Sequence, residues 1–124
     1  MMKKYNIVLV IICLFTFPVA CGNKLDLGAF DKAKWQADAN GCSSVRNTML
    51  EELEEVKPKL LGLYQKAIIK VLGQPEEQEL YKRSQTYYIY WLDPMEGCTA
   101  PSEKPRKLEV RFTALGIANE INIR

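Results

Sequence analysis

The spacing of apolar residues changes from helical to strand-like near residue 75, and this change most constrains the fold. Within 43–57, apolar residues recur three or four positions apart, which predicts a helix. Within 107–113, apolar and polar residues alternate one by one, which predicts a strand with one buried face. Helices followed by consecutive strands favour an α+β domain built from two layers.

Two helices and three strands are predicted from these patterns. The first helix covers 43–57, because Pro58 disfavours helical geometry at the residue before it. The second covers 64–72, where Gly73 caps the helix and Pro75 prevents its continuation. Strands are expected at 86–92, 107–113 and 117–123, and residues 79–84 either add a short strand or extend the first one. We therefore expect two N-terminal helices packed on one face of a three-stranded antiparallel sheet.

An apolar segment of 14 residues, 7–20, follows a short basic start and ends at Cys21. This length suits the core of a signal peptide and falls short of the roughly 20 residues that span a bilayer. The sequence from Pro18 to Cys21 resembles the lipobox of bacterial lipoproteins, in which the cysteine is lipidated and becomes the new N-terminus. Two alternatives remain open, namely ordinary cleavage after Gly22 and an uncleaved anchor.

The resemblance to lipoproteins implies a particular organisation of the chain. Residues 1–20 would be a lipoprotein signal peptide, 21–29 a tether and 30–124 a single α+β domain. Removal of the signal peptide leaves 15 basic and 15 acidic residues, so the charge gives no reason to expect nucleic acid as a partner. Because Gly22 rather than Asp follows Cys21, we expect a lipid anchor in the bacterial outer membrane, with the domain facing the periplasm.

Export also bears on the remaining cysteines. Cys13 leaves with the signal peptide and Cys21 is acylated, so Cys42 and Cys98 are left as a pair in an oxidising compartment. We predict that they form a structural disulfide. A redox pair and a metal site are the alternatives, but the sequence has no CxxC motif and no His. No metal and no cofactor is expected.

An ordered set of residues marks the second helix and the sheet: Gly62, Ile68, Leu72, Gly73 and Pro75, then Tyr87 to Trp91, then Phe112 to Gly116. This set resembles the small outer-membrane lipoproteins of the SmpA/OmlA (BamE) family. Tyr64 departs from the family pattern, which usually has Thr or Ser at this position, and the two mature cysteines are not part of it. The resemblance implies the two-layer fold and a place in envelope or outer-membrane protein assembly, but a shared fold does not carry over partner contacts.

Catalysis is not expected from this sequence. It has no His, which is the commonest general base, and no GxSxG motif, P-loop or paired-carboxylate spacing. We therefore expect a lipid-anchored interaction or scaffold module that binds an envelope protein. A small ligand-binding or inhibitor-like lipoprotein on the same fold is the alternative.

The strand over 86–92 supplies the candidate partner surface: Tyr87, Tyr88, Ile89, Tyr90 and Trp91. Alternation sends Tyr88, Tyr90 and Leu92 to one face of the sheet, and Tyr87, Ile89 and Trp91 to the other. Only one of these sets can face the helices. The other set is either an exposed aromatic patch, as favoured at protein interfaces, or is covered by the loop 93–105 or by the segment containing Phe30 and Trp35.

Overall fold

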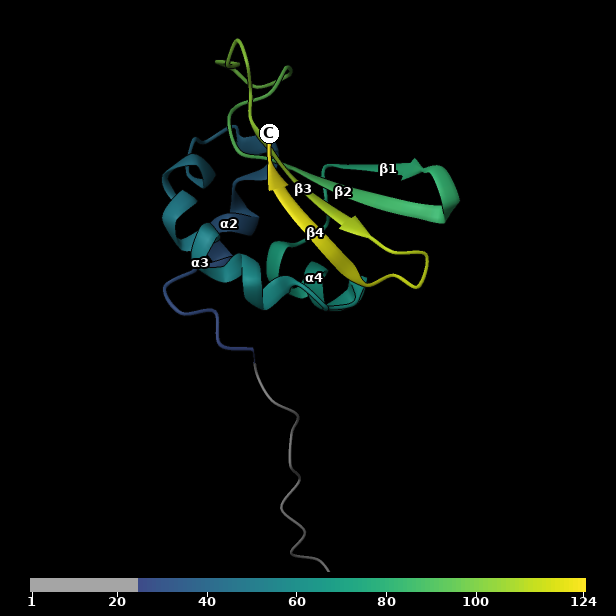
Figure 1. The fold of residues 1–124 in the computed structure, drawn as a ribbon. Helices are drawn as coiled ribbons and strands as arrows, with labels where there is room; N and C mark the ends of the chain where they lie inside the picture. Colours follow the sequence, from purple (N-terminus) through teal and green to yellow (C-terminus); the bar gives the residue numbers. More distant parts are fainter. Residues whose placement is uncertain (1–24) are drawn as a thin grey trace, which may run out of the picture.

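The computed structural model describes residues 25–124 and shows helices packed against an antiparallel sheet (Figure 1). The helices are α2 Lys32–Ala37, α3 Leu50–Leu60 and α4 Gln65–Leu72, and the strands are β1 Glu77–Tyr81, β2 Gln85–Trp91, β3 Lys107–Phe112 and β4 Ala118–Ile123. Three 3-10 turns lie between them: η1 Ala39–Gly41, η2 Arg46–Thr48 and η3 Lys82–Ser84. The predicted signal peptide and the predicted lipidation site Cys21 lie outside the described residues.

The α+β class is confirmed, but the numbers of helices and strands differ from the prediction. Within residues 25–124 the sheet has four strands in the order β1-β2-β3-β4, each antiparallel to the next. The additional strand is β1. Of the two alternatives left open for residues 79–84, the structure therefore shows a separate short strand and not an extension of β2. The additional helix is α2, which begins after Asp31, whose carboxylate accepts hydrogen bonds from the backbone N–H groups of Ala33 and Lys34.

The helix predicted for 43–57 has different bounds. Residues 46–48 form the 3-10 turn η2, and α3 begins at Leu50 and continues through Pro58 to Leu60. The expectation that Pro58 would end this helix is therefore wrong. Pro58 is exposed, whereas Leu60 is fully buried in the core, so burial of the last turn offsets the backbone hydrogen bond that proline cannot donate.

The helix predicted for 64–72 and the three predicted strands are found within one residue of their expected bounds. Gly73 ends α4 with a φ of 79°, a conformation that glycine adopts without steric cost. Within residues 25–124, no helix has the length and apolar character needed to cross a membrane.

The core lies between the helices and one face of the sheet, here called the inner face. Its largest fully buried apolar side chains include members from α2, α3, α4 and two strands, β2 and β3: Trp35, Leu53, Leu60, Ile68, Leu72, Tyr90, Leu108 and Phe112. Cys42 and Cys98 form a disulfide with their Cα atoms 5.3 Å apart, as the sequence predicts. This bond connects the η1 region to the long loop between β2 and β3.

Candidate partner-binding surface

The alternation predicted for β2 divides its aromatic residues between the two faces of the sheet. Tyr88 and Tyr90 belong to the inner face and are 5% and 0% exposed. Tyr88 packs edge-on against Phe112 with ring centroids 4.6 Å apart, and Tyr90 lies 6.2 Å from Trp35. The Tyr90 hydroxyl donates to the Gly73 carbonyl oxygen at 2.9 Å, and burial raises the pKa of this phenol. Both side chains therefore form part of the core and are not available to a partner.

The opposite face of the sheet, here called the outer face, carries Tyr87, Ile89 and Trp91. Tyr87 and Trp91 are half-buried, whereas Ile89 is fully buried although it is not part of the core cluster. Its register partners are Glu77 on β1 and Glu109 on β3, so charged residues flank Ile89 on both sides. Of the predicted partner surface, Tyr87 and Trp91 are thus the members that reach solvent.

Ion pairs join the charged side chains of the outer face. Glu109 lies 3.2 Å from Lys107 and 3.6 Å from Arg124, measured between carboxylate oxygen and side-chain nitrogen. Arg111 pairs with Glu120 at 3.2 Å and donates from Nε to the side-chain oxygen of Gln85 at 2.9 Å. Hydrogen bonds from Asn122 and Arg111 lower the pKa of Glu120. The outer face therefore combines aromatic rings with a network of mutually neutralising charges.

Trp91 occupies one end of this face. The Nζ atom of Lys107, its neighbour in the register, lies 5.9 Å from the centroid of the indole, within the range of a cation–π contact. The indole Nε1 is buried and has no hydrogen-bond partner within residues 25–124. Buried donors without a partner are rare in folded proteins, so Trp91 carries an unused hydrogen-bonding group next to the surface.

Tyr81 on β1 adds an aromatic side chain that the predicted surface did not include. Its ring packs edge-on against Tyr87 with centroids 5.7 Å apart, and the residue is 58% exposed. Across the β1–β2 ladder, Tyr81 is the register partner of Gln85, which places it on the same face as Tyr87. Residues 77–81 do not alternate between apolar and polar, so only the hairpin register shows that Tyr81 lies beside Tyr87. Phe30 and Trp35 pack in the core on the inner face, so they do not cover this surface.

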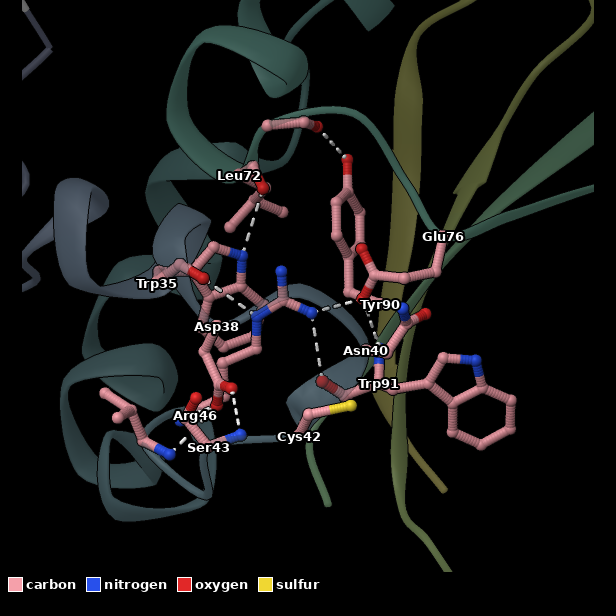
Figure 2. A network of polar contacts seen from close by, with 12 residues as sticks. Trp35, Asp38, Asn40, Cys42, Ser43, Arg46, Leu72, Glu76, Tyr90 and Trp91 are labelled. Atoms are coloured by element: carbon pink, nitrogen blue, oxygen red, sulfur yellow. Dashed lines mark hydrogen bonds and ion pairs between the residues drawn. The ribbon is translucent and has the colours of Figure 1, made fainter. Parts of the chain in front are cut away.

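A buried polar network binds the backbone of β2 at Trp91, as Figure 2 shows. Arg46 is 1% exposed, and its guanidinium donates to the carbonyl oxygens of Trp35 at 2.9 Å and Trp91 at 3.0 Å. The same guanidinium forms an ion pair with Glu76, whose Oε1 also accepts from the Trp91 backbone N–H at 3.0 Å. Arg46 and Glu76 together therefore satisfy both backbone polar groups of Trp91.

The same network ties the helical layer together. Asp38 is buried, and its carboxylate accepts from the backbone N–H groups of Ser43, Val45 and Arg46 at 2.7–2.9 Å. The Arg46 guanidinium carbon lies 4.7 Å from the centroid of the Trp35 ring. The Arg46 and Glu76 charges are paired with each other, and the Asp38 carboxylate is satisfied by backbone N–H groups, so the network connects β2 to α2 and η2 through defined hydrogen bonds.

Asp93, at the start of the loop between β2 and β3, is hydrogen-bonded to Arg106 at the end of the same loop. Its carboxylate accepts from the backbone N–H and the guanidinium of Arg106 at 2.7–3.0 Å, and from the Asn47 side chain at 3.3 Å. The hydrogen bond from the Arg106 side chain is the largest of the effects that lower the pKa of Asp93 to about 2. Gly41 lies against this junction, where a Cβ atom would come within 2.7 Å of the Asp93 carbonyl oxygen.

Comparisons with models of protein families, with curated proteins and with solved structures found no match to this chain. The resemblance to the SmpA/OmlA (BamE) family therefore stays a prediction from the sequence. Within the described range 25–124, no group of three or more Cys, Asp or Glu side chains is arranged to hold a metal ion.

Proposed function

We propose that the protein is a lipid-anchored, non-enzymatic interaction module that faces the periplasm from the bacterial outer membrane. In this proposal it binds another envelope protein through the outer face of its sheet and contributes to envelope or outer-membrane protein assembly. The anchor is Cys21, and the resemblance to SmpA/OmlA (BamE) lipoproteins supports the same location.

The observation that carries this proposal is the composition of the outer face. The helices pack on the inner face (Figure 1), and the outer face presents the ring of Tyr87, the indole of Trp91 and the guanidinium of Arg111. Tyrosine, tryptophan and arginine are the residues enriched at protein interfaces and at their binding hot spots. A face with these residues on a rigid sheet presents a surface that does not need to be ordered before binding.

The experiment is co-purification of the full-length chain from detergent-solubilised membranes. We expect Tyr87→Ser and Trp91→Ser each to weaken binding of a stoichiometric envelope partner about thirtyfold, since hot-spot aromatic residues typically contribute about 2 kcal/mol or more. Tyr64→Ser is the control, because Tyr64 is 62% exposed and precedes α4 rather than lying on the outer face. The proposal fails if the wild-type chain retains no stoichiometric partner, or if all three variants retain it equally.

A second candidate function, the binding of a small molecule, is favoured by one cavity. This cavity has a volume of about 430 Å³ and lies between α2 and the start of α3, lined by Lys34, Ala37, Asp38, Ser43, Val45, Thr48, Met49 and Glu52. The Glu52 Oε2 atom is buried without a hydrogen-bond partner within residues 25–124, which provides an acceptor for a ligand that donates a hydrogen bond. Native mass spectrometry of the purified chain tests this function: a bound molecule should be present in the wild type and absent in Glu52→Gln.

A further inference from the structure

The two edges of the sheet differ in how much of their backbone is covered. At the β4 edge, the backbone N–H of Gly62 donates to Ala118 and the N–H of Ala118 donates to Leu63, both at 2.8 Å. Tyr64 forms a further bridge to Ile117. At the other edge, all five residues of β1 are exposed, and Figure 1 shows the β1–β2 hairpin extending away from the helices. An open edge strand presents unpaired backbone donors and acceptors to another strand.

A row of paired residues on the inner face, apolar except for Thr86, ends at this open edge. Leu80 is paired with Thr86, which is paired with Phe112 and, through it, with Ala118. The last three residues are 8%, 0% and 1% exposed, whereas Leu80 is 82% exposed. The row is therefore covered on three strands and uncovered on the fourth. Another strand beside β1 would bring side chains against Leu80 and extend the buried row.

Charges are segregated along the edge in a self-complementary way. Glu77 and Glu79 are the first and third of the five residues of β1, and Lys82 and Arg83 follow its last residue. None of these four side chains forms an ion pair with another residue in the described part of the chain, 25–124. An antiparallel copy of the same segment brings the acidic end of one strand to the basic end of the other.

We propose that two copies of the chain associate through β1 to form one continuous antiparallel sheet, with a two-fold axis at Leu80. In a symmetric antiparallel pair, residues that face each other must lie on the same face of the sheet. This holds only if one residue of β1 is paired with the same residue of the second copy, and the two-fold axis then passes between these two residues. Centred on Leu80, the pairing places Leu80 against Leu80 and Glu79 against Tyr81 of the second copy. Beyond this short ladder, Glu77 faces the η3 turn of the second copy, which carries Arg83. Centred on Glu79, it would place two carboxylates directly opposite each other, which is destabilising.

The occupant of the edge is a second copy because the segment complements itself in both charge and apolar contact. The β-ladder is short, so the association is weak in solution. A lipid anchor would hold both copies at one membrane and raise their effective concentration. The proposal does not depend on partner binding at Tyr87 and Trp91, and its variants change neither residue.

A mixing experiment with the full-length chain in detergent tests the proposal. Sedimentation equilibrium should show a concentration-dependent dimer for the wild type. Glu77→Arg alone and Arg83→Glu alone should each weaken it about tenfold or more, because both symmetry-related contacts become repulsive. When the two variants are mixed, one contact pairs the introduced Arg with the introduced Glu and the other pairs the native Arg83 with the native Glu77. Mixing should therefore restore dimerisation.

The control for the mixing experiment is Glu55→Arg, which reverses an exposed charge on α3 and should leave the dimer unchanged. Circular dichroism checks that each variant has the wild-type fold. The proposal is overturned if the wild type is monomeric at all concentrations. It is also overturned if the β1 edge binds a different protein and not a second copy of the chain. A dimer that neither charge reversal weakens, or that mixing fails to restore, also overturns it.

A covalent test uses the position on the axis itself. Leu80→Cys places two thiols opposite each other across the interface, at the separation of a cross-strand pair, which is close to what a disulfide needs. We expect a covalent dimer on a non-reducing gel under mild oxidation. Tyr64→Cys, at another exposed position, is the control for random collisions, and the wild type is the control for the native cysteines. Equal yields from the two variants, or no dimer from Leu80→Cys, would contradict the proposed pairing.

Discussion

At the scale of single residues, the buried guanidinium of Arg46 joins three segments that are far apart in the chain. Arg46 is the only charged residue between Asp38 and Glu51 in the sequence, and arginine side chains are usually solvated. Its guanidinium donates to Trp35, which lies 11 positions earlier in the chain than Arg46, and to Glu76 and Trp91, which lie 30 and 45 positions later. Only the folded arrangement brings these groups together, because no local pattern links them.

The first prediction concerns the ion pair of Arg46 and Glu76, whose side chains are 2% and 9% exposed. Arg46→Met should lower the free energy of unfolding by roughly 3–5 kcal/mol, because it leaves a buried carboxylate without its partner. The double variant Arg46→Met/Glu76→Leu should lose less than this, since the uncompensated charge is then removed. Urea unfolding of the full chain measures both. Lys59→Met, at an exposed position, is the control, and a loss below about 1 kcal/mol for Arg46→Met would contradict a structural role for the pair.

The second prediction is a pH dependence that arises from Asp93. The hydrogen bond from Arg106 holds its folded-state pKa at about 2, below the ordinary value of 3.8. Because the folded-state pKa is depressed, the stabilisation is fully present above pH 3.8 and is lost as the pH falls through about 2. Asp93→Asn should therefore be less stable than the wild type by roughly 2 kcal/mol at pH 7.

The same difference should shrink between pH 4 and pH 2, which urea unfolding at several pH values measures. Glu103→Gln, at an exposed position in the same loop, is the matched control and should show no comparable trend. A stability difference for Asp93→Asn that stayed constant down to pH 2 would contradict the assigned pKa.

At the scale of elements, the sequence was most reliable where punctuation and periodicity agreed. Gly73 and Pro75 predicted the end of α4, alternation identified β3 and β4, and the density of aromatic and β-branched residues identified β2. α2 was missed because six residues are too few to show a helical period. α3 was misplaced at its end because the propensity of Pro58 was outweighed by burial of Leu60, a tertiary effect that the local sequence does not contain.

The third prediction follows from this conflict in α3. Replacing Pro58 by Ala supplies a backbone N–H that can donate to the carbonyl of Glu54, and alanine is the residue best suited to a helix. The larger entropy of the unfolded chain opposes this gain. We expect Pro58→Ala to raise the free energy of unfolding by about 1–2 kcal/mol. Thermal and urea unfolding measure it, with Glu55→Ala as a control in the same helix, and an unchanged or lower stability would be the opposite result.

At the scale of the whole molecule, alternation predicted the two aromatic sets but not which set would face the helices. The choice depends on which side of the sheet α2, α3 and α4 occupy, and that is set by long-range packing of Trp35 and Leu53 rather than by β2 itself. The burial of Ile89 on the outer face was also not predictable. Its register partners, Glu77 and Glu109, lie on two neighbouring strands, and the sequence does not specify that register.

The last prediction concerns the disulfide, which joins residues 56 positions apart and connects the helical layer to the long loop above the sheet. Closing a loop of this length restricts the unfolded chain and stabilises the fold by roughly 4 kcal/mol in the chain-entropy model. The double variant Cys42→Ser/Cys98→Ser should lose about this much stability. Wild-type chain unfolded with and without a reducing agent should show the same difference.

The disulfide and the β1 edge act at opposite ends of the sheet, which allows their effects to be separated. Loss of the disulfide removes a covalent link between η1 and the loop following β2, but Asp93 and Arg106 still hold that loop by their own hydrogen bonds. The serine variant should therefore keep its fold at 25 °C and dimerise as the wild type does, while its unfolding midpoint in urea falls. A variant that unfolded without urea would mean that the core of this small domain is not sufficient without the covalent link.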